Sequence, residues 1–374
     1  MKILKRLCLV ILMAIAFTPC ANGAEDPVSD SFREEWDVFV ESIPEEIRPL
    51  AQDTFNSANA GEAMKETLSL SFFGGKIASA LKDAWPSSLG LLFSLTGLLI
   101  FSALFHRLRE SLSSETMNAA GNLCGTLCLI LCITPMIRSA SEMSEGYLNM
   151  LASCSGGISP VVCALFVSSG NITTATVTNT TLMLVYTLFQ NGIRVFLWPV
   201  VQMAYVMGIV GNLGGSLRLD GISRFVRRLF TWLLSLVMLF LSVLIGVQST
   251  MAVSADSFSM KTAKFALGNF IPLVGNALSD AVGTVAGSLS LIKNSCGVFG
   301  IVTVALLLLP VLLHLLLHRA VIGVAQGIAE LLGCEREGRI LGDVYATVGY
   351  ILAVVALSSA LFLFILALII SVRF

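Results

Sequence analysis

The chain has 374 residues, of which 56% are hydrophobic and only 13% are Asp, Glu, Lys or Arg. Its mean hydropathy is +0.86, whereas a soluble domain usually carries about 25% charged residues. The formal net charge of -1 excludes a strongly basic protein, so no nucleic-acid partner is expected. Several apolar runs exceed the ~18 residues that are typical of a membrane-spanning helix. The composition therefore predicts an all-α polytopic membrane protein in contact with membrane lipid.

The first 23 residues have the features of a secretory signal peptide. Lys2, Lys5 and Arg6 form a basic start, and residues 7–17 form a short apolar core. Small residues then precede a cleavage site near Gly23. We expect residues 1–23 to be a signal peptide, with an uncleaved anchor as the alternative.

Residues 24–86 hold more than half of the 24 acidic residues of the chain. Apolar residues at three- to four-residue spacing predict a short amphipathic helix here, which Pro44 ends: Phe32, Trp36, Phe39, Val40 and Ile43. Two further helices are expected at about 45–57 and 61–82. This extracytoplasmic region is too small for a large core of its own, so it should pack on the membrane part or on a partner.

Residues 87–374 are predicted to form the transmembrane domain. We expect about eight spanning helices, at about 87–105, 117–137, 148–168, 175–193, 195–215, 229–249, 297–317 and 345–371. This division leaves a connection at residues 138–147 and places Arg194 in a tight turn. The fourth span is rich in Thr and Asn, which can hydrogen-bond to neighbouring helices, so it should lie inside the bundle.

Arginine clusters predict the orientation of the spans. With residues 24–86 outside, the odd-numbered spans one, five and seven end inside. All the arginines that should set the topology then fall on one side, as the positive-inside rule requires: Arg107, Arg109, Arg224, Arg227, Arg228 and Arg319. Arg138 and Arg373 do not follow this pattern.

Residues 250–296 are expected to form an extracytoplasmic connection that is either re-entrant or amphipathic and interfacial. Between Lys264 and Lys293 the sequence is apolar with one charge, yet it is interrupted by residues that disfavour a lipid-spanning helix. Such a segment must be buried in protein or line water. We predict a docking or pore-vestibule element formed by Gly268, Asn269, Pro272, Gly275, Asp280, Gly283 and Gly287.

No catalytic motif of the GxxxxGK[ST], GxSxG or HExxH type occurs in the sequence. His314 and His318 are four residues apart, but without a third ligand nearby we favour interfacial snorkelling over a metal site. Cys124, Cys128 and Cys132 share one helix face and predict a packing stripe. We therefore expect a protein that is not an enzyme and that has no cofactor or metal.

The stretch KFALGNFIPLVGNALSDAVGTVAGSLSLIKNSCGVFG (264–300) resembles the stage III sporulation protein AE family. The segments SGGISPVV (155–162) and GNLGGSLRLDGISRFVRRLFTW (211–232) fit the same family. The resemblance implies a polytopic subunit of a secretion-like channel complex, located in the outer forespore membrane made by the mother cell. It also implies a role in forespore development after engulfment. The implied partners are other membrane subunits of the stage III sporulation A operon, a secretion-type ATPase and ring-forming subunits.

A secondary transporter or permease is the alternative function. Helices interrupted by Gly and Pro form substrate sites in transporters, and residues 268–287 can be interpreted in this way. Transporters commonly contain paired repeats, and no convincing second copy of this segment is present. An intramembrane enzyme is disfavoured, because no nucleophile is paired with a base.

Overall fold

The computed structural model describes residues 30–43, 48, 70–110, 115–168, 186–213, 220–255 and 275–371. Across these ranges every regular element is a helix and no strand is found, so the all-α prediction is confirmed. The helices are α2 (Asp30–Ser42), α5 (Leu70–Glu110), α6 (Glu115–Ser168), the π-helix η1 (Ile193–Leu197), α8 (Trp198–Leu213), α9 (Asp220–Ala255), α11 (Gly275–Leu331) and α12 (Glu335–Ser371). The predicted signal peptide lies outside the described residues.

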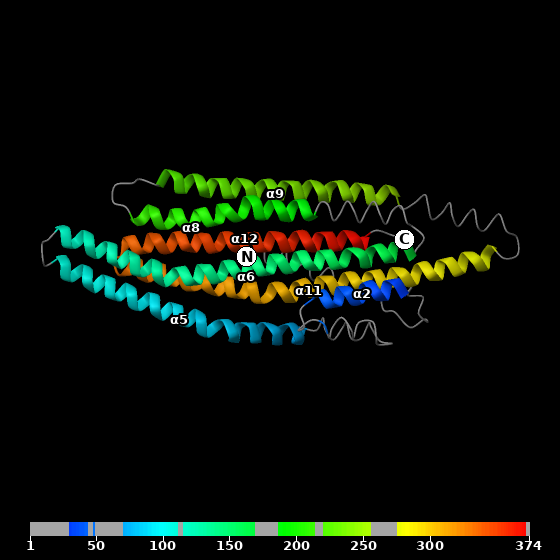
Figure 1. Cartoon of the computed structure of the whole chain (residues 1–374), viewed down its shortest axis with the longest axis horizontal. Helices are drawn as coiled ribbons and strands as arrows, with labels where there is room; N and C mark the ends of the chain where they lie inside the picture. Colours follow the sequence, from blue (N-terminus) through cyan, green and yellow to red (C-terminus); the bar gives the residue numbers. More distant parts are fainter. Residues whose placement is uncertain are drawn as a thin grey trace.

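The long helices lie side by side along one axis of the molecule, and α12 runs through the middle of the bundle (Figure 1). It packs against α11, α8 and α6. Its inward side chains form the centre of the core and are almost completely buried: Val348, Ile351, Val354, Val355 and Leu361. Because α12 is covered by other helices on most sides, it contributes no exposed large hydrophobic residue within the described part.

Five helical stretches are long and apolar enough to cross a membrane: Gly74–Phe105, Leu123–Ala164, Tyr186–Asn212, Phe299–Leu331 and Glu335–Ala367. These stretches indicate membrane association by length and composition. The predicted number of eight spans is not confirmed, since the described residues contain five such stretches.

The connection predicted at residues 138–147 was wrong, because these residues lie in the middle of the single helix α6. Polar side chains lower the hydropathy there without ending the helix. Ala140, Ser144 and Tyr147 are buried at helical spacing, while Arg138 and Glu142 form an exposed i,i+4 ion pair. With 54 residues, α6 is about 80 Å long, far longer than the ~30 Å hydrocarbon core of a bilayer.

Arg194 does not lie in a tight turn, as had been predicted, but inside the π-helix η1. The backbone is helical from residue 186 to residue 213, so the predicted spans 175–193 and 195–215 meet in one helix. Residues 175–185 lie outside the described residues. The Arg194 guanidinium donates to the Asn149 side-chain oxygen on α6. A residue of another helix therefore provides a hydrogen-bond acceptor for this guanidinium.

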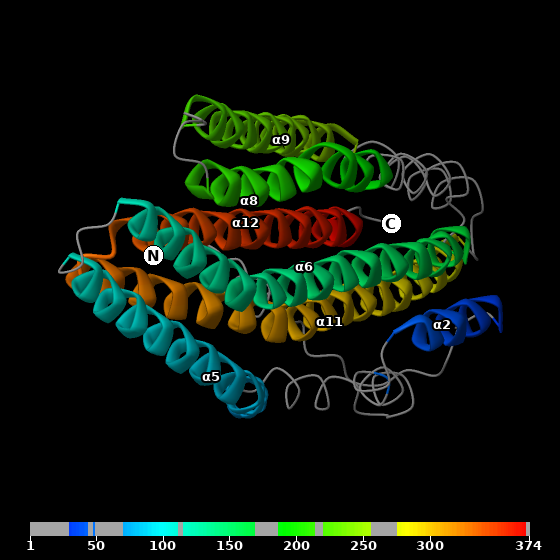
Figure 2. The ribbon, with the colours of Figure 1, turned by 60° about the vertical axis from the view of Figure 1, so that its left-hand side comes forward.

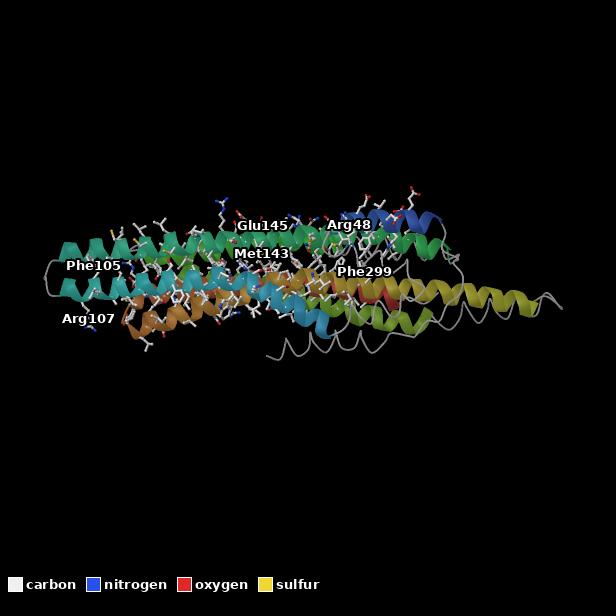
Figure 3. All side chains as sticks on the ribbon, turned by 90° about the horizontal axis from the view of Figure 1, so that it is seen from below. Arg48, Phe105, Arg107, Met143, Glu145 and Phe299 are labelled. Atoms are coloured by element: carbon white, nitrogen blue, oxygen red, sulfur yellow. The ribbon has the colours of Figure 1, made fainter. Side chains whose placement is uncertain are left out.

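The amphipathic helix predicted near the N-terminus is confirmed as α2, and it packs on the membrane part of the chain. Trp36 and Phe39 are 5% and 1% exposed. Both rings contact Phe299 of α11, with centroid distances of 5.5 Å for Trp36 and 6.3 Å for Phe39. Arg48 donates to the Glu41 carbonyl at 3.2 Å, which satisfies a backbone acceptor at the C-terminal end of α2. Figure 2 shows α2 toward the C-terminal end of α6, and Figure 3 labels Arg48 near α2 and Phe299 near the middle of α11.

The helix predicted at 61–82 and the first predicted span form one helix in the structure. α5 begins at Leu70 and continues through Pro86 to Glu110. The first part of the predicted helix, residues 61–69, and the helix predicted at about 45–57 lie outside the described residues, apart from Arg48.

The segment predicted to be a re-entrant or interfacial connection is described from residue 275 onward, and residues 275–296 join the next predicted span without a break. α11 starts at Gly275 and is helical to Leu331, with Pro310 inside it. Gly283 and Gly287 are therefore positions on the N-terminal third of a 57-residue helix. Three of the predicted docking positions precede α11 and lie outside the described residues: Gly268, Asn269 and Pro272. The side chain of Asp280 also lies outside the described part of the structure.

Candidate functional site

Three pairs of helices turn at the same end of the molecule: α5 with α6, α8 with α9, and α11 with α12 (left in Figure 1). Five of the six arginines predicted to set the topology lie at this end. Arg107 and Arg109 lie at the end of α5, and Arg224, Arg227 and Arg228 lie in the first turns of α9. We call this the hairpin end of the bundle.

An ion pair connects α9 to α12 near the hairpin end. Arg227 donates to the carboxylate of Asp343, whose side chain is only 19% exposed. Asp343 also accepts from the Asn212 amide of α8 at 3.3 Å. Arg336 donates through Nε to the Asn212 backbone carbonyl at 2.7 Å. These polar contacts connect the three helices α8, α9 and α12.

Gly208 allows α8 and α12 to approach closely enough for these contacts. A Cβ atom at Gly208 would lie 2.8 Å from the Cβ atom of Asp343, closer than real Cβ contacts. Small residues at such crossings let helix backbones come together in membrane proteins. Gly208 is therefore part of the site although it carries no polar group.

A second polar contact connects α5 and α12, next to Gly125 of α6. The Ser102 hydroxyl donates to Glu337 at 2.8 Å, and the position of a Cβ atom at Gly125 lies 3.4 Å from the same carboxylate oxygen. Cys334, between α11 and α12, points its thiol toward the Leu99 carbonyl at 3.9 Å. Burial, and then the Glu337 carboxylate, raise the pKa of the Cys334 thiol above its ordinary value. The thiol is therefore protonated at neutral pH.

Arg319 lies further from the hairpin end, on the face of α11 that packs against α12. Its guanidinium carbon is 4.4 Å from the centre of the Tyr345 ring, a cation–π contact. The position of a Cβ atom at Gly349 is 3.3 Å from the same carbon, so the glycine makes room for the guanidinium. Arg319 Nε is buried and has no hydrogen-bond partner within the described part of the chain.

The preferred interpretation of His318 as a snorkelling interfacial side chain was wrong. His318 is 3% exposed, and its Nδ1 is 2.8 Å from the His314 carbonyl. The helix does not end nearby but continues to Leu331. Among the described residues no group of three or more His, Cys, Asp or Glu is placed to hold a metal ion.

Of the predicted cysteine packing stripe, Cys132 packs against the core of the chain, whereas Cys124 and Cys128 do not. Cys124 and Cys128 are exposed, and Cys132 is partly buried. Cys124 and Cys128 lie beside exposed apolar residues of α6: Leu123, Leu127 and Leu131. These two thiols therefore belong to the apolar outer surface of α6.

A groove of about 290 Å³ lies between α6, α8 and α12, and most of its surface is apolar. Its apolar lining residues are Ile137, Val201, Val206 and Ile351, and its polar lining residues are Thr134, Arg138, Ser141, Glu142, Glu145, Gln202, Tyr205 and Thr347. The Thr134 and Tyr205 hydroxyls are hydrogen-bonded at 2.9 Å and connect the two sides of the groove. Figure 3 labels Glu145 and Met143 on this stretch of α6.

Sequence reasoning missed this groove. The available signal was the spacing of Arg138, Glu142 and Glu145, which places three charges on one face of a helix. The apolar residues of α8 that lie beside them could not be assigned as neighbours from sequence. Only the packing of α6 against α8 reveals that the polar residues form one surface.

The fold and these contacts define a class: an all-helical protein with five helices able to cross a membrane and with polar contacts between them. The sequence profile of the family described as Stage III sporulation protein AE (spore_III_AE) matches residues 55–373. The chain therefore belongs to the stage III sporulation protein AE family, as the resemblance of residues 264–300 had indicated.

A curated relative supports this assignment. The chain is similar to "Stage III sporulation protein AE" of Bacillus subtilis (strain 168), with 25% identity over 212 residues. The match covers 57% of this chain and 53% of the relative, so it spans about half of the relative's length. No solved structure matches the chain. Family membership supports a role in sporulation.

Proposed function

We propose that the protein is a membrane subunit of the sporulation-specific, secretion-like channel complex between mother cell and forespore. On this proposal it is needed for forespore development after engulfment. The single observation that supports a channel function is the length of the helices α6 and α11. α6 and α11 have 54 and 57 residues, about 80–85 Å at 1.5 Å per residue. A bilayer core of ~30 Å covers less than half of that length.

The part of the helices outside the bilayer core offers surface to other subunits. α2 already packs at the border of this part through Trp36 and Phe39, against α6 and against Phe299, the first residue of the stretch Phe299–Leu331. We assign this end to the intermembrane space, where ring-forming subunits assemble, and the hairpin end with its arginines to the mother-cell cytoplasm. A secretion-type ATPase would meet the hairpin end, and other membrane subunits of the same operon would surround the bundle. The protein would act without enzymatic activity or cofactor, in the cell membrane and, in sporangia, in the outer forespore membrane.

The N-terminal third of α11 is the proposed docking or vestibule element. Its glycines let a neighbouring subunit approach the helix closely. We expect Gly275→Leu and Gly283→Leu to block assembly while the protein still inserts into the membrane. Gly327→Leu on the same helix is the matched control, because no atom lies within 4 Å of a Cβ atom at Gly327. Normal sporulation of both docking variants would contradict this role.

A secondary transporter remains the alternative function. It was predicted to use a broken helix around residues 268–287, but α11 is unbroken from Gly275 onward. The feature that favours transport is instead the groove between α6 and α8, which is lined in part by polar side chains. A transporter would be needed for uptake of a solute, whereas a channel subunit would be needed only in sporulating cells.

Deletion of the gene in its host, with inducible complementation, tests the proposal. We expect normal vegetative growth and arrest of sporulation after engulfment, restored by induction. Normal spores together with a defect in growth or uptake would contradict the channel function and favour the transporter.

A further inference from the structure

At the same height along the bundle axis, one helix exposes apolar side chains and its neighbour exposes polar ones. The contacts of Thr134 with Tyr205 and of Asn149 with Arg194 fix this height. Between these contacts, η1 and α8 expose large apolar side chains: Val195, Phe196 and Met203. Over the same height, the exposed residues of α6 are polar or small: Thr134, Pro135, Arg138, Ser139, Glu142, Glu145, Gly146 and Asn149.

The two faces cannot border the same medium. The apolar face lies within Tyr186–Asn212, a stretch able to cross a membrane, and is suited to acyl chains. Arg138 and Glu142 have side chains that are 79% and 62% exposed at the same height, and charged groups in contact with acyl chains are strongly disfavoured. The polar face of α6 must therefore meet water or polar groups while the face of α8 meets lipid.

The groove between these faces has the size and the lining to hold water. Its volume of about 290 Å³ exceeds that of several water molecules at ~30 Å³ each. Most of the lining surface is apolar, but hydroxyl, amide and carboxylate groups from α6, α8 and α12 are present and can supply the hydrogen-bond partners that ordered water requires. Two carboxylates, Glu142 and Glu145, accompany one cation, Arg138, in the lining.

We propose that this groove is filled with water in the membrane and is the aqueous face of the chain, open to small hydrated cations. This inference deepens the proposed function, on which it rests, because a channel subunit needs one face that borders an aqueous path. It assigns that face to α6 and the lipid-facing side to α8.

The groove ends toward the hairpin end at the ion pair described above. Thr347 lines the groove, and its hydroxyl donates at 2.9 Å to the backbone carbonyl of Asp343. Asp343 lies one helical turn closer to the hairpin end on α12. On α8, Gly208 follows Tyr205 and packs directly against Asp343. The Asp343 contacts with Arg227 and Asn212 occupy the space between these helices.

Cysteine accessibility in membranes that contain the full chain tests the proposal. Gln202 and Met203 are adjacent exposed residues of α8, but only Gln202 lines the groove. A membrane-impermeant cationic methanethiosulfonate should modify Gln202→Cys at least ~10-fold faster than Met203→Cys, because the reactive thiolate forms only where water solvates it. The unsubstituted chain gives the background from native cysteines. Equal rates at the two positions, or no modification of either, would overturn the proposal.

A position on the opposite wall keeps the test decisive if Gln202→Cys does not accumulate. Ser141→Cys on α6 faces the same groove and should also be modified rapidly. Slow modification of Ser141→Cys would likewise overturn the proposal. The labelling needs no spores, so its failure is distinguishable from failure of the proposed function in the deletion strain.

The charge of the lining gives a second measurement. At Gln202→Cys, a cationic reagent should react several-fold faster than an anionic reagent of similar size. Glu145→Gln should reduce this preference, whereas Glu330→Gln, which lies outside the groove on α11, should leave it unchanged. Equal rates for the two reagents would overturn the assignment to cations.

Discussion

Arg227 and Asp343 are 116 residues apart in the chain and form an ion pair between α9 and α12. The pair lies beside Gly208 and Asn212 of α8, so three helices meet at one carboxylate. Arg227 was predicted from sequence only as one of several cations that set the orientation. The structure gives it a second role, which is to hold the α8–α9 pair against the central helix.

Asp343→Ala should lower the free energy of unfolding in mild detergent by about 1–2 kcal/mol. The value lies below that for a fully buried pair because Arg227 is 43% exposed, and solvent screens the interaction. Thermal unfolding of the purified chain measures the effect. Arg228→Ala, at an exposed neighbouring position, should change stability by less than ~0.5 kcal/mol.

A combined substitution separates the ion pair from other effects of the change. Arg227→Met together with Asp343→Leu should be less destabilised than Asp343→Ala, because no charge remains without its partner. If Asp343→Ala and Arg228→Ala have the same small effect, the pair does not hold the helices together.

Gly208→Ala should be destabilising although alanine is the better helix former. The new Cβ atom would meet the Asp343 Cβ atom at 2.8 Å, and neither atom can move without a shift of its helix. We expect a loss of about 1–3 kcal/mol, as for other overpacked positions. Gly90→Ala on α5, where no atom lies within 4 Å of the new Cβ atom, should be neutral or more stable by up to ~1 kcal/mol. Equal behaviour of the two variants would show that α8 and α12 do not touch at Gly208.

Phe39→Ala should detach α2 from the bundle. A helix of 13 residues is marginal without tertiary contacts, and Phe39 is 1% exposed against α6 and α11. Protease added to the outer side should therefore cut near α2 several-fold faster in this variant. Val38→Ala, at a residue that is 56% exposed on the opposite face, should retain the protection of the unsubstituted chain. Identical cleavage rates would mean that α2 does not dock through Phe39.

Cys334 should still react slowly with thiol reagents at the pH at which an ordinary cysteine ionises. Burial and the Glu337 carboxylate raise its pKa, so the reactive thiolate appears only at higher pH. Mass spectrometry of labelled peptides as a function of pH measures this profile. Glu337→Gln should shift the profile to lower pH, since the neighbouring negative charge is removed. A plateau at the pH of an ordinary thiol in the unsubstituted chain would contradict this environment.

Hydropathy predicted the helical class but not the division into helices. In α6, the polar residues Arg138, Glu142 and Glu145 suggested a loop, while the buried face is built from Ala140 and Ser144, which contribute little hydropathy. In η1, Arg194 suggested a turn, because its partner Asn149 belongs to another helix and is invisible in the local sequence. By contrast, α2 was predictable because its buried residues are large and strictly periodic.

The predicted orientation does not depend on these errors. Joining 117–137 with 148–168 removes one crossing, and joining 175–193 with 195–215 removes a second. Because an even number of crossings is lost, the arginines at the start of α9 still lie at the same end as those of α5. The groove and the Arg227–Asp343 pair could not be predicted, since both depend on which helices are neighbours.

Isolation of the tagged full-length chain from sporulating cells after mild cross-linking tests membership of the channel complex most directly. The proposed function predicts that the chain is recovered in a large assembly with a secretion-type ATPase and ring-forming subunits, and that Gly283→Leu removes these partners while Gly327→Leu does not. Recovery of the chain alone, at the size expected for its 39.9 kDa plus detergent, would contradict it.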